Sequence, residues 1–218
     1  MARWDVVLFD LDGTLTDPKE GITRSIAYAL GKMGVEAGDP DGLTRFIGPP
    51  LARSFAECYG FDGARVAEAV GWYRERFVER GLYENAVYAG VPELLAALRD
   101  VGRRVALATS KPTVYARQIL GHFDLEGCFD AVIGSNLDGT RVDKAEVIAC
   151  AMEAFPGLPA TDFVMVGDRR HDMEGAARCG IACVGVTYGY GSCEELAACG
   201  PAALVDTVGD LRALLLAG

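Results

Sequence analysis

The chain of 218 residues is short of the residues and patterns that several protein classes need. It has only two histidines, His122 and His171, and its seven cysteines form no C-x-x-C pair, so no zinc-ligand spacing emerges. The cysteine count is odd, and reduced thiols are the expected state. No run approaches the roughly 18 apolar residues of a membrane-spanning helix. The sequence therefore favours neither a zinc protein nor a membrane protein.

Basic residues are also few. Lys and Arg number 21 against 31 Asp and Glu, which gives a net charge of −10. A nucleic-acid binder needs a basic face, so neither nucleic acid nor a membrane is expected as a partner, whereas a small anionic substrate remains compatible if a metal ion and a lysine reverse the sign locally. The start, MARWDVVLFD, has no long apolar stretch and no small-residue cleavage site, so a cytoplasmic location is expected. Nothing in the sequence indicates the oligomeric state.

Short apolar runs alternate with helical patterns along most of the chain. The runs are continuous rather than alternating in polarity, as in parallel strands that are buried on both faces. The alternation predicts an α/β fold, a doubly wound parallel sheet of the Rossmann-like kind. The predicted strands cover residues 4–11, 103–110, 130–135, 162–168, 181–187 and 202–206, and helical stripes fall near 92–101, 113–121, 143–154, 172–179, 193–199 and 207–216.

One stretch, residues 17–83, shows helical patterns and no convincing strand. Asp17 is expected to cap the first of these helices, with Glu20 completing a capping box. The sequence therefore predicts an α/β core of residues 1–16 and 84–218 with an inserted helical cap of residues 17–83. The two connections, near 16 and near 83, are candidate hinges.

Polar residues follow the predicted strands at the edge where an open parallel sheet binds its ligands. Four of them are carboxylates, two are hydroxyls and at least one is a lysine. They are Asp10 and Asp12 after the first strand, Thr109, Ser110 and Lys111 after the second, Lys144 at the start of a helix, and Asp168 and Asp172 after the strand 162–168.

The crowded acids predict a metal ion. Two carboxylates about 4 Å apart repel each other by roughly 4 kcal/mol at an effective dielectric constant near 20. A divalent cation removes that repulsion, and oxygen ligands without histidine or cysteine favour Mg²⁺. The predicted cofactor is therefore Mg²⁺.

The same residues suit phosphoryl transfer. A carboxylate is ionised at neutral pH and needs no general base to act as a nucleophile, so Asp10 can attack phosphorus and form an aspartyl phosphate. Asp12 can serve as general acid and then as general base. Thr109 or Ser110 would donate a hydrogen bond to a phosphoryl oxygen, and Lys144 would offset the charge of the transition state.

Four motifs carry a family resemblance. DLDGTLT, ATSK, the Lys144 region and GDRRHD, in this order, resemble the motifs of the haloacid dehalogenase superfamily, and the helical insertion resembles the cap of its phosphoglycolate-phosphatase-like branch. FIGPPL, ATSKP, SNLDGT and GVTYGYGS are similar to a subgroup described as 5′-nucleotidase-like. The resemblance implies that Asp10 is the nucleophile, Asp12 the acid/base, Thr109 the phosphate binder and Lys144 the charge-neutralising lysine. It also implies metal contacts from Asp10, the backbone carbonyl of Asp12 and Asp168, with Asp172 supporting them directly or through water.

The sequence thus predicts a Mg²⁺-dependent phosphatase of a small phosphorylated metabolite, for example phosphoglycolate or a nucleoside 5′-monophosphate. A phosphomutase of the same superfamily would keep all the motifs. A receiver-type signalling domain also places a phospho-accepting Asp, a Thr or Ser and a Lys above a parallel sheet, but it needs only about half this length. A pure interaction module would show no dependence on Mg²⁺.

Overall fold

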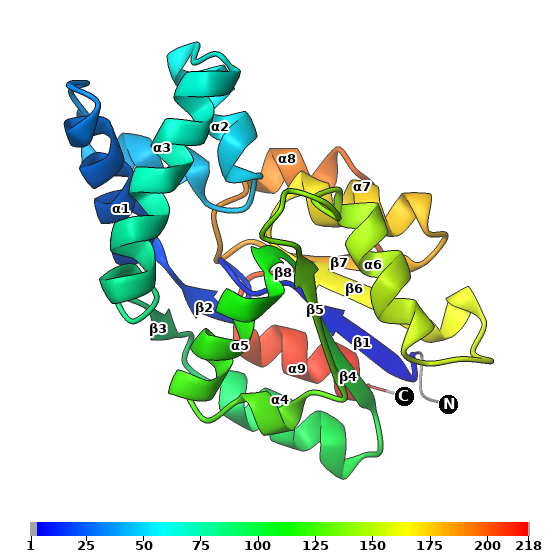
Figure 1. The fold of residues 1–218 in the computed structure, drawn as a ribbon. Coiled ribbons are helices and arrows are strands. Elements are labelled where there is room, and N and C mark those ends of the chain that lie inside the picture. The colour runs from blue at the N-terminus through cyan, green and yellow to red at the C-terminus, as the bar shows by residue number, and fades with distance from the viewer. Residues whose placement is uncertain (1–3, 218) are drawn as a thin grey trace. The chain divides into compact units, whose positions relative to one another are not determined.

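The computed structural model describes residues 4–217. The described chain divides into two compact units (Figure 1). The α/β unit consists of the residues up to Asp17 and those from Val87 onward, and the helical unit runs from Pro18 to Ala86. The helical unit is thus inserted into the α/β unit near its N-terminus.

A parallel sheet forms the centre of the α/β unit and confirms the predicted fold class. Its strands lie in the order β5–β4–β1–β6–β7–β8, and every pair is parallel. The continuous apolar runs seen in the sequence are buried in the central strands, as expected for strands that are covered on both faces. The strands are β1 (Val6–Phe9), β4 (Arg104–Pro112), β5 (Ala131–Ser135), β6 (Phe163–Gly167), β7 (Ala182–Val186) and β8 (Ala203–Val205).

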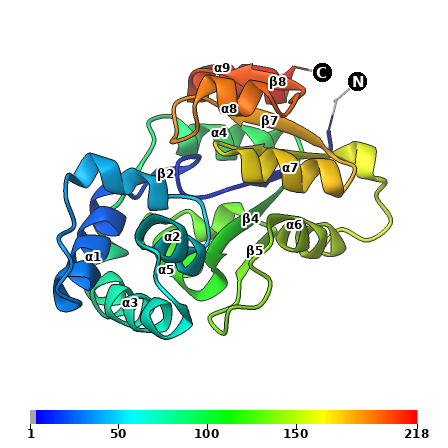
Figure 2. The same ribbon diagram turned by 90° about the horizontal axis from the view of Figure 1, so that it is seen from above.

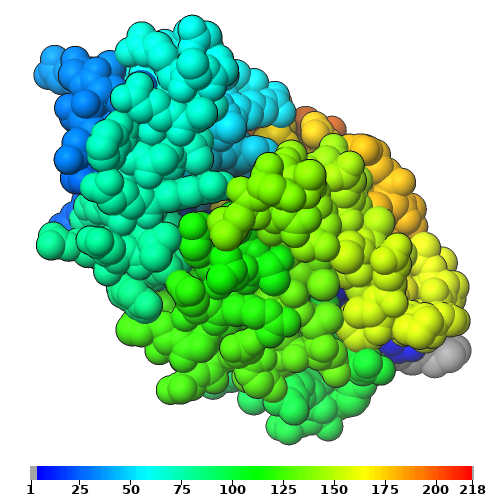
Figure 3. All heavy atoms as spheres, in the orientation of Figure 1, coloured from blue at the N-terminus to red at the C-terminus, as the bar shows by residue number. Residues whose placement is uncertain are grey.

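Helices cover both faces of this sheet (Figures 1 and 2). Side chains on one side of the strands, such as Val6 and Leu8, form a core with the helices α6 (Lys144–Glu153), α7 (Arg170–Arg178) and α8 (Cys193–Ala197). The other face is covered by α4 (Val91–Asp100), α5 (Thr113–His122) and α9 (Val208–Leu216). In the space-filling view the green and yellow segments, which include α5 and α6, form much of the surface of the α/β unit that faces the viewer (Figure 3). Short 3-10 turns at Glu126–Cys128 and Ala160–Asp162 complete the connections.

The strand order places a topological switch at β1. From β1 the chain proceeds outward through β4 to β5, then returns to β6 on the opposite side of β1. Ligands bind outside the carboxyl ends of the strands at such a point. The residues that follow β1 and β6 are therefore the ones that the fold brings to a binding position.

The helical unit contains α1 (Lys19–Lys32), α2 (Leu51–Tyr59) and α3 (Gly63–Arg76), with a 3-10 helix at Pro40–Phe46 and a π-helical turn at Phe77–Gly81. The expected cap of the first helix was wrong. Pro18 occupies the capping position of α1 without a side-chain hydrogen bond, and Asp17 lies in the short strand β2 (Thr16–Asp17). This strand pairs with β3 (Ala86–Val87), so a two-stranded sheet lies where the chain passes between the units. Among the described residues, none of the helices is long and apolar enough to cross a membrane.

Two glycines of α1 differ in how closely the helical unit packs around them. A Cβ atom added at Gly21 would lie 2.0 Å from the backbone oxygen of Gly81, whereas one added at Gly31 would meet nothing within 4 Å. Gly21→Ala should therefore lower the free energy of unfolding of the helical unit by about 1–3 kcal/mol through overpacking. Gly31→Ala should raise it by about 0.5–1 kcal/mol, because alanine restricts the unfolded chain and favours the helix.

Urea denaturation followed by the fluorescence of Trp72 would measure both changes. Trp72 belongs to α3, and a Trp4→Phe background removes the other tryptophan of the chain. Two substitutions that shift stability in the same direction would contradict the close packing of α1 at Gly21.

Candidate active site

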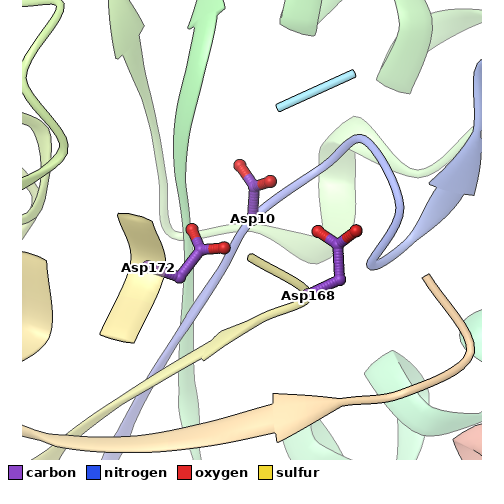
Figure 4. A group of neighbouring side chains, drawn as sticks. All are labelled: Asp10, Asp168 and Asp172. Carbon is purple, nitrogen blue, oxygen red and sulfur yellow. The ribbon is translucent and has the colours of Figure 1, made fainter. Parts of the chain in front are cut away.

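Three carboxylates gather at the carboxyl edge of the sheet, where β1 and β6 lie side by side. Asp10 directly follows β1, Asp168 directly follows β6, and Asp172 lies in the first turn of α7. One oxygen of each lies within 4.8 Å of the other two, and all three side chains are buried. Figure 4 shows them arising from three separate segments, with the carboxylates on the same side. We call these residues the acidic cluster.

Lys144, the first residue of α6, reaches into the acidic cluster. Its Nζ lies 2.8 Å from Oδ1 of Asp10 and 2.6 Å from Oδ1 of Asp172, and its side chain is buried. Burial alone would lower the pKa of Lys144, but the charges of Asp10 and Asp172 outweigh burial and raise that pKa. The lysine therefore stays protonated, with its ammonium group fixed between two carboxylates.

The acidic cluster still has an excess of negative charge. Lys144 supplies one positive charge against three carboxylates, so two negative charges remain when all three are ionised. Desolvation by burial raises the pKa of Asp168 well above its ordinary value, and the charges of Asp172 and Asp10 raise it further. Desolvation also raises the pKa of Asp172, against the opposing charge of Lys144. A divalent cation would balance the excess, and a set of carboxylate oxygens suits Mg²⁺, so the residues present fit that ion.

Asp12 has a different partner from the other three acids. Its Oδ2 lies 2.7 Å from Nζ of Lys111, and both side chains are buried. Its Oδ1 is buried and has no hydrogen-bond partner among residues 4–217. Burial raises the pKa of Asp12, and Lys111 opposes this only in part. The Asp12 side chain is thus outside the acidic cluster, and it keeps one oxygen for a group that enters the site.

The predicted phosphate-binding hydroxyls lie on β4, the neighbour of β1. Thr109 is buried, and its Oγ1 accepts a hydrogen bond of 3.3 Å from the backbone N–H of Lys111. Ser110 is half-buried, and its carbonyl oxygen accepts a hydrogen bond of 2.8 Å from the hydroxyl of Ser135. Thr109 therefore lies at the same edge of the sheet as Asp10. The carbonyl group of Ser110 is hydrogen-bonded to Ser135 of β5.

The loop between β7 and α8, residues 187–192, folds over Asp168; we call it the β7–α8 loop. The backbone N–H of Tyr190 donates a hydrogen bond of 2.7 Å to Oδ2 of Asp168. A Cβ atom added at Gly189 would lie 2.4 Å from Cβ of Asp168. On the other side Gly13, with φ +84°, approaches so closely that an added Cβ would lie 2.2 Å from the same Oδ2. Asp168 is therefore enclosed by backbone that leaves room for no side chain at either glycine.

Two residues in contact with the site were given no role from the sequence. Lys111 was placed at this edge directly after the predicted phosphate-binding residues, but nothing local indicates that it pairs with Asp12. Tyr190 lies within GVTYGYGS, which carries part of the family resemblance, but its contact with Asp168 was not predicted, because it is made by a backbone N–H that every residue except proline carries. Asp17, expected to cap a helix, instead accepts a hydrogen bond from the hydroxyl of Tyr190.

Comparisons with known proteins identify the family of the chain. Residues 7–186 match the family model described as haloacid dehalogenase-like hydrolase. The chain is 51% identical over 213 residues to a protein of Pseudomonas aeruginosa named 5′-nucleotidase, covering 98% of this chain and 96% of that protein. It is 42% identical over 189 residues to the tyrosine-protein kinase PtkA of Mycobacterium tuberculosis, covering 87% of this chain but only 64% of that protein. The crystal structure of a predicted phosphatase from Clostridium acetobutylicum superposes with a TM-score of 0.94 at 46% identity, covering 98% of both chains.

Proposed function

This chain belongs to the haloacid dehalogenase-like hydrolases and is a phosphoric monoester hydrolase, and on that premise we propose that it dephosphorylates nucleoside 5′-monophosphates through an aspartyl phosphate on Asp10, with Mg²⁺ as its cofactor. The observation that carries the proposal is the position of Asp10. Its carboxylate lies at the topological switch of the sheet, paired with the ammonium group of Lys144 and next to Asp168 and Asp172. The carboxylate of Asp10 therefore has beside it both a positive charge and the further carboxylates that a cation needs.

In the first step an oxygen of Asp10 attacks phosphorus. A bond forms between that oxygen and phosphorus, and the ester P–O bond breaks. Lys144, held 2.8 Å from Asp10, places a positive charge beside the phosphoryl oxygens while this happens. Thr109, at the same edge of the sheet, supplies a hydroxyl that can donate to one of those oxygens.

Asp12 would move the protons of both steps. It gives a proton to the leaving oxygen in the first step and takes one from water in the second, when the water oxygen attacks phosphorus and frees Asp10. Two features of Asp12 support this role: its burial raises its pKa, and its Oδ1 is buried without a partner among the described residues. Lys111, paired with Oδ2, keeps the carboxyl group in one orientation.

The cation would be held by the carboxylates of Asp10 and Asp168 and by the backbone carbonyl of Asp12. When bound, Mg²⁺ supplies positive charge that balances the acidic cluster and the incoming phosphate. Asp172 would support it through water, because both of its oxygens already accept hydrogen bonds from nitrogen. Oδ1 lies 2.6 Å from Nζ of Lys144, and Oδ2 lies 3.0 Å from the backbone nitrogen of Arg169.

The substrate class rests on two supports. The Pseudomonas aeruginosa relative named 5′-nucleotidase is 51% identical over nearly the whole chain, and FIGPPL, ATSKP, SNLDGT and GVTYGYGS carry the resemblance to a 5′-nucleotidase-like subgroup. Selection among phosphomonoesters falls to the helical unit in this proposal, because it is inserted in the chain only a few residues after the nucleophile.

A phosphate-release screen tests the proposal. Nucleoside 5′-monophosphates, nucleoside 3′-monophosphates, phosphoglycolate, sugar phosphates and pyrophosphate would each be assayed with MgCl₂ and with EDTA. We expect phosphate release only with MgCl₂ and a kcat/KM for a 5′-monophosphate at least about tenfold above that for its 3′-isomer, since a pocket that fixes one phosphate position typically discriminates by 1–3 kcal/mol.

Other outcomes of the screen would replace the proposal. A preference for phosphoglycolate would change the substrate class and leave the chemistry in place. Transfer of phosphate between two positions of a sugar would identify a phosphomutase, and a persistent acyl phosphate without turnover would identify a receiver-type domain. Transfer from ATP to a protein tyrosine, the activity in the name of the Mycobacterium tuberculosis relative, would contradict a monoester hydrolase.

A further inference from the structure

Tyr190 contacts two functionally different parts of the α/β unit. Its backbone N–H donates a hydrogen bond of 2.7 Å to Oδ2 of Asp168 in the acidic cluster. Its hydroxyl donates a hydrogen bond to Oδ1 of Asp17, the last residue before the helical unit begins. One residue therefore joins the acidic cluster to the place where the chain leaves the α/β unit.

The segment around Tyr190 is closely packed against the turn that follows β1. The hydroxyl of Tyr188 donates a hydrogen bond of 2.9 Å to the carbonyl oxygen of Thr14. A Cβ atom added at Gly189 would lie 2.4 Å from the carbonyl oxygen of Gly13, and one added at Gly191 would lie 2.0 Å from the carbonyl oxygen of Asp168. The β7–α8 loop thus lies directly on the turn that leads from β1 to Asp17.

The turn under the loop is itself fixed by hydrogen bonds. The backbone N–H groups of Leu15 and Thr16 donate to the carbonyl oxygen of Leu11, and the hydroxyl of Thr14 donates to Oδ1 of Asp168 at 3.4 Å. At its other end Tyr190 reaches this turn through its hydroxyl, which donates a hydrogen bond to Oδ1 of Asp17. A displacement of Asp168 would therefore be passed to Asp17 through Tyr190.

We propose that Tyr190 is a positioning residue that couples cation binding at Asp168 to the conformation of the chain at Asp17, where the helical unit begins. The inference rests on the proposed function to the extent that the acidic cluster binds Mg²⁺. Coupling between two sites is reciprocal, so a change at the Asp17 end alters the affinity for the cation at the Asp168 end. Removing the hydroxyl of Tyr190 should weaken Mg²⁺ binding although the backbone contact with Asp168 is kept.

The test compares Tyr190→Phe, Asp17→Ala and the double variant with the wild-type chain. MgCl₂ is titrated in thermal unfolding, where a ligand that binds the folded state stabilises it in proportion to ln(1 + [Mg²⁺]/Kd), so Kd is obtained without an activity assay. We expect each single variant to raise the Kd for Mg²⁺ about fivefold, the lower end of typical coupling between sites. The double variant should show no further increase, because both changes remove the same hydrogen bond.

Tyr188→Phe is the matched control. It removes a hydroxyl two residues away in the same loop, but one that donates to the carbonyl oxygen of Thr14 rather than to Asp17. In a Tyr188→Phe background, Asp17→Ala should still raise the Kd by its full factor. Hydrogen exchange gives a second measurement: Mg²⁺ should slow exchange of the amides of residues 14–22 in the wild-type chain and not in Tyr190→Phe.

The outcomes separate this inference from the proposed function. If wild-type protein binds Mg²⁺ and hydrolyses its substrate, while Tyr190→Phe keeps the wild-type Kd or the two single effects add in the double variant, the coupling is absent and the phosphatase stands. If MgCl₂ does not stabilise the wild-type protein, the proposed cation site and the coupling both fail.

Discussion

Asp10→Asn is expected to lower kcat for hydrolysis of p-nitrophenyl phosphate by about 10⁴-fold or more, the scale seen when a catalytic nucleophile is removed. The amide of asparagine is a poor nucleophile, so the first step loses the oxygen that attacks phosphorus. The fold should survive, because the ammonium group of Lys144 keeps the carboxylate of Asp172 at 2.6 Å. Steady-state release of p-nitrophenol at saturating MgCl₂ measures the effect.

Asp100→Asn is the matched control for this change. Asp100 ends α4 in the same unit, and its side chain is exposed. The control should keep wild-type kcat, and circular dichroism should show the same helical content in both variants. Residual turnover by Asp10→Asn within about tenfold of wild type would remove Asp10 from the role of nucleophile.

Asp168→Asn is expected to shift stability in opposite directions without and with the cation. In EDTA the substitution removes a fully buried carboxyl group whose pKa is raised by burial and by Asp172 and Asp10, and such a group lowers stability at neutral pH, so the free energy of unfolding should rise by roughly 1 kcal/mol or more, about 2–4 °C in Tm. In MgCl₂ the variant should be stabilised far less than wild type, because one of the cation's oxygen ligands has lost its charge. Activity should fall at least about 100-fold, and more MgCl₂ should be needed to restore any part of it.

The substitution Asp168→Asn keeps the shape of the side chain and can keep its hydrogen bonds. An asparagine oxygen can still accept the hydrogen bond from the backbone N–H of Tyr190, and the amide nitrogen would face the hydroxyl of Thr14. Differential scanning calorimetry with EDTA and with MgCl₂ gives both values, again with Asp100→Asn as the control. An unchanged response to MgCl₂ would exclude Asp168 from the cation site.

The fold could be predicted from local patterns, because buried parallel strands and amphipathic helices each have a characteristic pattern of apolar residues in the sequence. Continuous apolar runs identified each strand of the large sheet, and the boundaries differ from the structure by a few residues at most. The short strands β2 (Thr16–Asp17) and β3 (Ala86–Val87) were missed, because two residues cannot show a period. The capping assignment of Asp17 was wrong for a related reason: its partner, Tyr190, lies at the other end of the chain.

The site could be predicted as a set of residues but not as a set of contacts. Because parallel strands end at one edge, Asp10 and Asp168 could be placed at that edge from the sequence, and the structure brings one carboxylate oxygen of each within 4.8 Å of the other. The pairing of Asp12 with Lys111 could not be predicted, since it depends on how the side chains after β1 lie relative to those at the end of β4. The enclosure of Asp168 by Gly13 and Gly189 is a property of backbone positions that no local pattern specifies.

The insertion of the helical unit has a consequence for the order in which the chain acquires its structure during synthesis. The helices of residues 18–86 contact one another over short sequence separations and can form as soon as they leave the ribosome. β1 must wait much longer, because its neighbours on the two sides, β4 and β6, are made later, β6 only at Phe163–Gly167. Until then Asp10 has neither Asp168 nor Lys144 beside it, so the proposed active site is expected to assemble only after the helical unit has been synthesised in full.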